Sequence, residues 1–172
     1  WGYSFMNPDT QFQHIPYKNF IRDSLLKFQF PFWMPGLFFG FPVFAEGQEG
    51  LLYPFNLLFS LFPAYTQITL QLYLHFVLSG IFMFMYLKII TNEKIAALLG
   101  AIMWVFSGLF IYWTGHINII QSVSYMPLFF FISEKFIREN KAVYLLLTAP
   151  LITVSIFIGQ LQSTFYILLR SE

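Results

Sequence analysis

The charged residues of this chain gather in four clusters, and this distribution restricts the folds that the chain can adopt. Three uncharged stretches separate the clusters, namely residues 50–87, 95–133 and 142–169. A charged side chain at the centre of a bilayer costs roughly 2.5–3.5 kcal/mol on insertion scales, so lipid can surround only such stretches. Charged residues make up 10% of the 172 residues, against about 25% in soluble domains. The sequence therefore predicts an all-α integral membrane protein, built as a multi-span helical bundle.

Composition also excludes several classes of protein and of site. Aromatic residues make up 22% of the chain, which is the opposite of a disordered composition. The absence of cysteine excludes a disulfide framework, a thiolate nucleophile and a cysteine-based zinc site. The three histidines do not follow the spacing of metal ligands, so we predict no metal site built from them. A net charge of +1 gives no reason to expect a nucleic-acid partner.

The longest uncharged stretch must fold back on itself. As one helix, residues 95–133 would be about 58 Å long, which is about twice the thickness of the hydrocarbon core. The polar interruption at residues 114–118 offers the turn, with Gly115 suited to it. We therefore predict spans near residues 95–113 and 118–133, joined by a tight hairpin.

The other two stretches each yield one further span. Residues 50–87 contain Pro54 and Pro63, so their first half is predicted to be a short interfacial or re-entrant segment. A full span follows near residues 67–87. The last stretch gives a span near residues 142–158, which brings the predicted number of transmembrane helices to about four.

Basic residues set the predicted orientation. The short connectors 88–94 and 134–141 are rich in Lys and Arg, so both are expected to lie in the cytoplasm. By alternation, residues 1–50 and the turns at 114–118 and 159–164 lie together on the outer side. This alternation gathers most of the remaining polar side chains at one face of the membrane.

The chain divides into two predicted parts. Residues 1–66 form an extracytoplasmic loop with interfacial helices, and residues 67–172 form the transmembrane bundle. Because the loop is outside, a span that precedes Trp1 is expected to carry the chain across the membrane. We therefore expect this sequence to be a fragment of a longer chain and to be inactive alone.

The loop contains one predicted helix between Pro16 and Phe28. It mixes aromatic and aliphatic residues with basic ones, which is typical of a helix in the headgroup layer. Arg22 on this helix is a candidate to contact a lipid phosphate. Plain anchoring at the interface is the alternative interpretation.

Three carboxylates of the loop raise the question of chemistry. Asp9 lies where the chain leaves the bilayer, a place where its pKa can be raised so that it acts as a base. A helix N-cap is the alternative for Asp9. Glu46 and Gln48 have small and apolar neighbours, so they are candidates to bind a cation or a sugar hydroxyl. Glu49 is interpreted as a solvated loop charge.

The predicted outer turns carry further candidates. His116 lies at the hairpin, and ionisable groups at membrane depth are functional suspects by default. It can also be a plain hairpin residue, and Asn118 can be a cap of the following helix. Gln160 and Gln162 occupy the second outer turn. His75 stands alone inside a span and is predicted to be a packed polar residue.

Taken in order, these motifs resemble those of the bacterial YfhO-like membrane proteins, relatives of the GT-C glycosyltransferases. The matching pieces are Pro8-Asp9-Thr10-Gln11-Phe12, Phe32-Trp33-Met34-Pro35, Phe39-Gly40-Phe41-Pro42, Ala45-Glu46-Gly47-Gln48, Tyr53-Pro54-Phe55-Asn56-Leu57-Leu58, Ser107-Gly108, Gly115-His116-Ile117-Asn118, Pro127-Leu128 with Glu134, and Gly159-Gln160-Leu161-Gln162. They cover essentially the whole chain. Two pieces depart from the family pattern, since Phe39 stands where the family often has Gly, and Gln160 stands where it often has His.

The resemblance implies a multi-pass protein of the bacterial cytoplasmic membrane that transfers a sugar from a polyprenyl-phosphate donor. The acceptor would belong to the cell envelope, for example a polymer of the teichoic-acid type. GT-C enzymes carry an essential acid soon after their first helix, and Asp9 is the matching position here. Asp9 would be the general base or the ligand of a divalent cation, and both alternatives stay open. His116, with Asn118 and Arg22, would lie near the departing phosphate.

The glutamine side chains complete this hypothesis, since Gln48, Gln160 and Gln162 would bind sugar hydroxyls. Two other classes of function remain open beside it. A transporter or flippase would place its binding groups near the bilayer midplane on broken helices. A non-catalytic membrane scaffold would leave the polar residues dispersed.

Overall fold

The computed structural model describes residues 8–160 and 162 of the chain. Within them the regular structure is helical, apart from one isolated antiparallel bridge between Met34 and Phe41. The all-helical prediction is therefore confirmed for this part of the chain. Residues 1–7 of the predicted loop, and residues 161 and 163–172 of the predicted bundle, lie outside the described residues.

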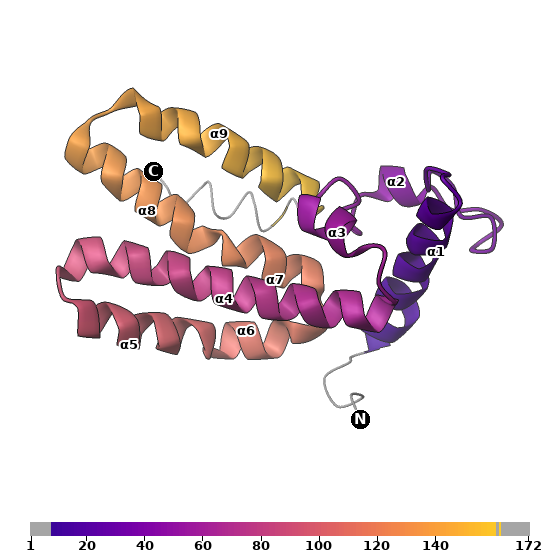
Figure 1. Cartoon of the computed structure of the whole chain (residues 1–172), viewed down its shortest axis with the longest axis horizontal. Coiled ribbons are helices and arrows are strands. Elements are labelled where there is room, and N and C mark those ends of the chain that lie inside the picture. Colours follow the sequence, from indigo (N-terminus) through magenta and orange to yellow (C-terminus); the bar gives the residue numbers. More distant parts are fainter. Residues whose placement is uncertain (1–7, 161, 163–172) are drawn as a thin grey trace.

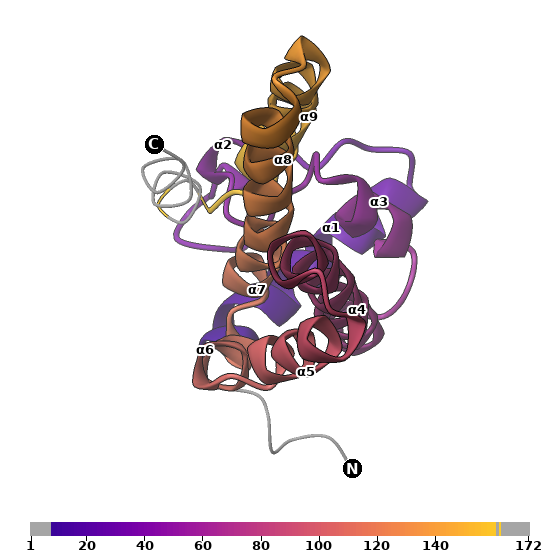
Figure 2. The ribbon, with the colours of Figure 1, turned by 90° about the vertical axis from the view of Figure 1, so that its left-hand side faces the viewer.

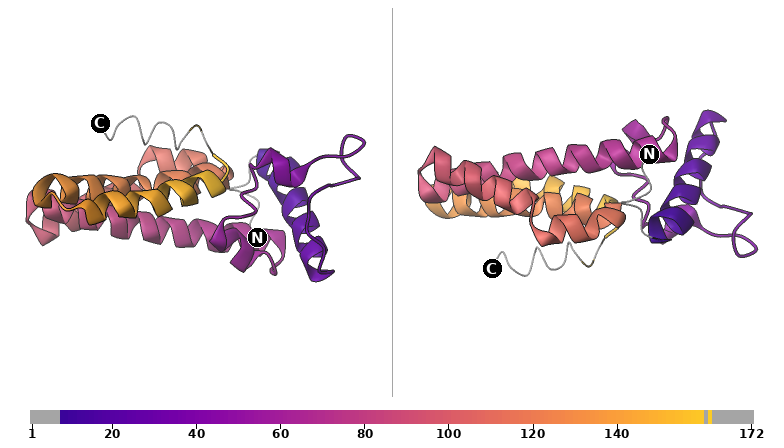
Figure 3. Two further views of the ribbon diagram at one scale, coloured as in Figure 1. Left: turned by 90° about the horizontal axis from the view of Figure 1, so that it is seen from above. Right: turned by 90° about the horizontal axis from the view of Figure 1, so that it is seen from below.

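The helices are numbered along the chain. They are the π-helical turn η2 (Thr10–His14), α1 (Ile15–Leu26), α2 (Val43–Glu46), α3 (Pro54–Phe59), α4 (Ala64–Thr91), α5 (Lys94–Val105), α6 (Gly108–Tyr112), the 3₁₀ turn η3 (Trp113–Gly115), α7 (Ile117–Ser124), α8 (Met126–Glu139) and α9 (Ala142–Phe157). Figure 1 shows α4, α5, α8 and α9 running along one axis, with α1, α2 and α3 gathered at one end. The views along the other axes agree that α1 crosses that end of the bundle (Figure 3).

Within the part of the chain that the structure describes, two helical segments are long and apolar enough to cross a membrane. One is α4, with 28 residues, and the other is Lys94–Gly115, with 22 residues, which joins α5, α6 and η3. Only 11% and 22% of the most apolar windows of these segments are buried inside the protein, whereas a core helix of a soluble protein is mostly buried. The apolar helix α9 is shorter, with 16 residues. The structure thus supports a helical membrane protein with two candidate spans.

Helix α4 carries its polar residues on its buried side. Gln67, Gln71, His75 and Ser79 recur every four residues and are buried, while Tyr73 and Val77 between them are exposed. A four-residue spacing places side chains on one face of a helix. The polar face of α4 therefore points into the protein and its apolar face points out, as lipid exposure requires.

The second segment is broken where the sequence analysis predicts one continuous span. Helix α5 ends at Val105, and α6 begins at Gly108 after Ser107, whose backbone is extended. Adjacent Ser and Gly residues are a common cause of helix kinks. The short helix α6 is then held by Phe110, which is fully buried against the rings of Phe76 and Trp104.

Helices α7 and α8 cover the region of the third predicted span but differ from it in two ways. A break at Tyr125 separates them, because Pro127 lies in the first turn of α8, where a missing backbone N–H is tolerated. Helix α8 also continues to Glu139, six residues beyond the predicted end at residue 133. Figure 2, which looks along the bundle, shows α8 between α4 and α9.

The end of α9 packs against the loop that precedes α3. Gly159 follows α9 with a φ of +85°, and a Cβ at this position would collide with the backbone of Gly47 and Gln48. Gly47 has a similar φ of +79°, but a Cβ there would meet no atom within 4 Å. Two glycines with the same backbone conformation therefore differ in how closely they are packed.

This difference predicts unequal effects of two matched substitutions. Gly159→Ala should lower the free energy of unfolding by about 2–5 kcal/mol, since it adds overpacking to left-handed backbone strain. Gly47→Ala carries the strain alone and should cost about 1–2 kcal/mol. Thermal unfolding of the full-length protein in detergent measures both. Equal losses for the two variants would contradict the close packing of α9 on the loop.

Candidate functional site

Asp9 and His116 meet at the end of the bundle that α1 crosses. The Asp9 Oδ2 atom lies 3.5 Å from His116 Nε2, with side chains that are 59% and 27% exposed. Asp9 occupies the N-cap position of η2 but makes no side-chain hydrogen bond to the helix backbone. The geometry therefore does not support Asp9 as a helix N-cap. It does support a contact between Asp9 and the hairpin at His116.

A second link holds the same two segments together. The Thr10 hydroxyl donates a hydrogen bond of 2.6 Å to the backbone carbonyl of Gly115, and Thr10 is buried. The Trp113 ring packs at 5.2 Å against the His116 ring, edge to face. The start of the described chain is thus joined to the α6–α7 hairpin at two successive residues.

A third part of the chain reaches the same end. The Asn118 side-chain amide donates to Gln160 Oε1 at 3.3 Å, while its carbonyl oxygen accepts the Ile119 backbone N–H at 3.0 Å. Asn118 lies inside α7, whose N-cap position is His116, so the capping interpretation is not supported, and the Asn118 amide instead contacts the turn after α9. The segments around residues 9, 116 and 160 are gathered at one end of the bundle.

Next to this contact lies a buried cluster of charged side chains. Glu49 accepts a hydrogen bond of 2.8 Å from His14 Nδ1 and lies 3.7 Å from Lys18 Nζ. All three residues are about 3% exposed. The interpretation of Glu49 as a solvated loop charge is therefore wrong. Glu49 is enclosed because α1 lies across the loop, and its Oε2 atom has no hydrogen-bond partner among residues 8–160 and 162.

Glu46 and Gln48 border this cluster. The Gln13 side-chain amide donates to Gln48 Oε1 at 2.7 Å, and the Gln48 backbone N–H donates to Glu46 Oε2 at 3.0 Å. Burial raises the pKa of the Glu46 carboxyl, and the nearby Glu49 carboxylate raises it further, against a lowering by the Gln48 N–H. Glu46 therefore holds a proton more readily than an exposed glutamate does.

Arg22 lies apart from this group. Arg22 donates to the Leu61 carbonyl at 3.3 Å and lies 3.5 Å from Asp23, farther along α1 than Lys18. The structure therefore places Arg22 against the segment between α3 and α4 and not beside His116. Gln162 lies just past Gln160, in helical conformation and with an exposed side chain.

Sequence reasoning missed His14 and Lys18 as partners of Glu49. Their four-residue spacing is the signal that could have found them, because it places both side chains on one face of the helical segment formed by η2 and α1. A loop carboxylate is the natural partner for two such groups once they are buried. Nothing in the local sequence around Glu49 marks it, since Glu46 lies in a similar setting.

A row of polar side chains continues from the site into the bundle. The Asn56 amide donates to the Glu49 and Gly50 carbonyls at 2.9 Å, and the Gln121 amide donates to Asn56 Oδ1 at 2.8 Å. The same Gln121 amide lies 3.1 Å from Gln71 Oε1. These contacts join the loop, α7 and α4 through groups that are all buried.

His75 belongs to a second set of hydrogen bonds deeper in the bundle. Its Nδ1 donates to the Gln71 carbonyl at 2.6 Å, so in the neutral ring Nε2 accepts the Tyr53 hydroxyl at 2.6 Å. The Tyr53 oxygen in turn accepts the Tyr125 hydroxyl at 2.8 Å. His75 is thus a buried polar residue with both ring nitrogens bonded, which agrees with the prediction of a packed residue.

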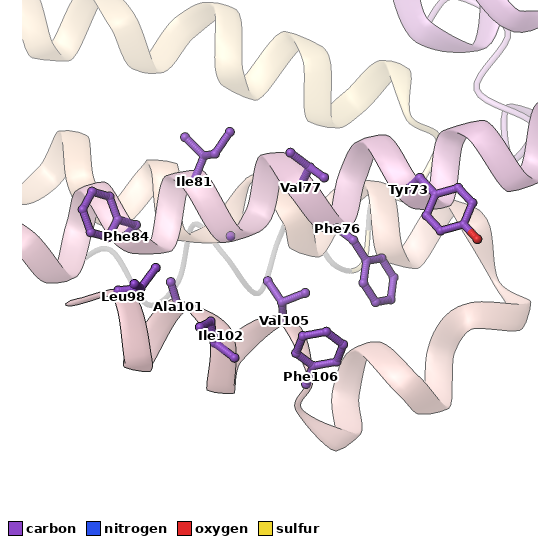
Figure 4. Close-up of a pocket in the computed structure, with 11 residues that line it drawn as sticks. Tyr73, Phe76, Val77, Ile81, Phe84, Leu98, Ala101, Ile102, Val105 and Phe106 are labelled. Carbon is purple, nitrogen blue, oxygen red and sulfur yellow. The ribbon is translucent and has the colours of Figure 1, made fainter. Parts of the chain in front are cut away.

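An apolar groove runs along the outside of α4 and α5. It has a volume of about 730 Å³ and is lined by α4 residues from Tyr73 to Phe84 and α5 residues from Leu98 to Val105, with Phe106. Figure 4 shows these side chains along the two facing helices. Among the described residues that line it there is no charged side chain, and the Tyr73 hydroxyl is the one polar side-chain group. The groove therefore has the character of a hydrocarbon-binding surface.

Comparison of the chain with protein-family models, curated proteins and solved structures found no match. The resemblance to YfhO-like proteins therefore stays a prediction. Among residues 8–160 and 162, no three His, Asp or Glu side chains are placed to hold a metal ion together. The functional argument rests on the arrangement of Asp9, His116 and their neighbours.

The buried cluster predicts a large effect of removing one charge. Glu49→Gln should lower the free energy of unfolding by about 3–5 kcal/mol, since it leaves Lys18 buried without a carboxylate. Adding Lys18→Met to this variant should restore most of the loss. Urea or thermal unfolding of the full-length protein in detergent measures both steps.

Asp23→Asn provides the control, because it removes an exposed carboxylate from the same helix α1. It should change the free energy of unfolding by less than about 0.5 kcal/mol. A Glu49→Gln variant as stable as Asp23→Asn would show that the cluster contributes nothing to the fold.

Proposed function

We propose that this chain is part of an outward-facing membrane glycosyltransferase that uses a polyprenyl-phosphate sugar as donor and a cell-envelope polymer as acceptor. The observation that carries the proposal is the 3.5 Å contact between Asp9 and His116 at one end of an apolar helical bundle. It pairs a partly exposed carboxylate with an imidazole. In this proposal the pair lies at the level of the lipid headgroups, where lipid-linked donors present their phosphates. In this proposal the α7–α8 pair and α9 are two further spans beside α4 and Lys94–Gly115.

The reaction needs a base and a site for a departing anion. The acceptor hydroxyl oxygen forms a bond to the anomeric carbon of the sugar, and the bond from that carbon to the phosphate oxygen breaks. The proton of the hydroxyl passes to Asp9, and the polyprenyl phosphate leaves as an anion. General bases of this kind contribute about 10²–10⁴-fold to rates.

The surrounding residues have separate tasks in this proposal. His116 orients the Asp9 carboxylate and, when protonated, faces the departing phosphate with a positive charge. Asn118 and Gln160, which are hydrogen-bonded to each other, and Gln48 offer amide groups to sugar hydroxyls. Arg22 has no part in it, because it lies against Leu61.

The apolar groove between α4 and α5 supports a lipid-linked donor. Its end toward the start of α4 is bounded by Tyr73 and Phe106, and α6 and η3 lead from there to His116. A polyprenyl chain is pure hydrocarbon, so burying it in an apolar groove is favourable at about 25 cal/mol per Å². A donor seated in the groove has its phosphate at the end of the bundle that carries Asp9.

A transporter is the second candidate, because the interior polar row favours it. Gln71, His75 and Gln121 lie between helices at depth, and no described residue bonds Gln71 Nε2. Transporters bind their substrates with such groups near the bilayer midplane. This function would move a polar solute past His75 without breaking a sugar–phosphate bond.

The orientation of the bundle is tested by cysteine labelling, which is clean because the chain has no native cysteine. Single variants Asp9→Cys and His116→Cys should react with an impermeant maleimide added outside intact cells. Lys94→Cys and Lys141→Cys, on the opposite connectors, should react only after the membrane is opened. Labelling of positions 9 and 116 from opposite sides would overturn the proposed site.

The proposed base is tested in liposomes that contain the full-length protein and a labelled polyprenyl-phosphate sugar. Asp9→Asn should reduce sugar transfer by about 10²–10⁴-fold while leaving the amount of protein in the membrane unchanged. Asp23→Asn, an exposed acid on α1, should transfer at the normal rate. Full transfer by Asp9→Asn would eliminate Asp9 as the base, and solute uptake that is lost in His75→Phe would favour the transporter.

A further inference from the structure

The end of the bundle opposite to Asp9 carries a pocket of about 480 Å³ between the last turns of α4 and α8. Its polar lining consists of Lys88, Asn92, Lys135 and Arg138. Its apolar lining consists of Met85, Ile89 and Phe131, which are half-buried. The pocket therefore combines three positive charges with an apolar wall, and none of the described carboxylates lines it.

The three cations are not equally neutralised by neighbouring acids. Lys135 bonds Glu139 at 2.7 Å, and Arg138 bonds Glu134 at 2.6 Å, both within one turn of α8. Among the described residues, no acid pairs with Lys88. A lysine has three donors and an arginine has five, so each paired cation keeps N–H groups for another anion.

The Glu139 carboxylate lies outside the pocket lining and is bound by neighbouring side chains. Hydrogen bonds from Lys135, Lys141 and Tyr144 lower the pKa of the Glu139 carboxyl to about 2. It therefore stays ionised and fixed to the α8–α9 connector at any physiological pH. Its partner Lys141 lies outside the pocket lining, which makes Lys141 a reference for a cation that belongs only to the connector.

The length of α4 sets the depth of the pocket in a bilayer. Its 28 residues make a helix of about 42 Å, which exceeds the hydrocarbon thickness of about 30 Å. Lys88 lies in the last turn of α4, so it is at the level of the lipid headgroups. Met85 lies one turn deeper, at the level where acyl chains begin.

A cation in the last turn of a helix also stabilises the carbonyl end of that helix, which accounts for Lys88 in α4 and Arg138 in α8. It does not explain why residues from two helices enclose a pocket with an apolar wall. Basic pockets between transmembrane helices are suited to anionic lipid headgroups.

We propose that this pocket binds the phosphate of an anionic phospholipid, with Lys88, Lys135 and Arg138 around the phosphate and the acyl chain against Met85, Ile89 and Phe131. The inference requires that α4 crosses the membrane, but it does not depend on sugar transfer at the other end. Failure of the proposed glycosyltransferase activity would therefore leave it untouched.

The test uses full-length protein in nanodiscs of phosphatidylcholine with a minor fraction of phosphatidylglycerol, and native mass spectrometry counts the lipids that stay bound. The unchanged protein should retain phosphatidylglycerol in preference to phosphatidylcholine. The double variant Lys88→Gln/Arg138→Gln should lose this preference by about fivefold for each cation removed.

The matched control is Lys94→Gln/Lys141→Gln, which removes the same charge from the same two connectors but from outside the pocket. It should retain phosphatidylglycerol as the unchanged protein does. Equal losses in both double variants would mean general surface attraction and would overturn the site, as would no loss in either. Displacement of the lipid by millimolar inorganic phosphate would assign the pocket to a free anion and overturn the lipid.

Discussion

The arrangement of the whole bundle depends on one constraint, which is that buried polar groups must find partners within the protein. Helix α4 presents Gln67, Gln71, His75 and Ser79 inward, and lipid-facing positions offer these groups no water. The Gln67 amide donates to the carbonyls of Ser60 and Phe62. Gln71 Oε1 accepts the Gln121 amide of α7, and His75 Nε2 accepts the Tyr53 hydroxyl. Ser79 accepts the Trp104 indole N–H. Each bond fixes a neighbouring segment, so the rotation of α4 about its axis sets the position of the loop, of α5 and of α7.

The sequence predicts those parts of the fold that depend on local signals. Charged connectors mark where helices end, and Asn92 and Asn140 close α4 and α8 in left-handed backbone conformation beside them. Gly115 and its polar neighbours mark the hairpin where η3 and α7 meet. The meeting of Asp9 with His116 follows from these signals as well, since alternation of helices leaves both residues at the same end.

Other features were not predictable, because they depend on partners far away in the sequence. Glu49 is buried only because α1 folds over it, and the sequence around Glu49 gives no sign of His14 or Lys18. The helix break at Ser107 contains no proline, and the break at Tyr125 lies two residues before Pro127. A hydropathy pattern therefore marks neither break. His75 shows a correct local prediction, a packed polar residue, whose hydrogen bond to Tyr53 only the tertiary structure reveals.

The extended residue Ser107 has a consequence for the end of the bundle that carries Asp9. It divides α5 from a short segment formed by α6 and η3, and His116 follows directly on that segment. Phe110 packs this segment against Phe76 of α4 and Trp104 of α5, while Thr10 and Asp9 contact Gly115 and His116 at its far end. The direction of the segment is therefore set by the seating of one phenyl ring between two long helices, and the position of the imidazole relative to the acid depends on that ring.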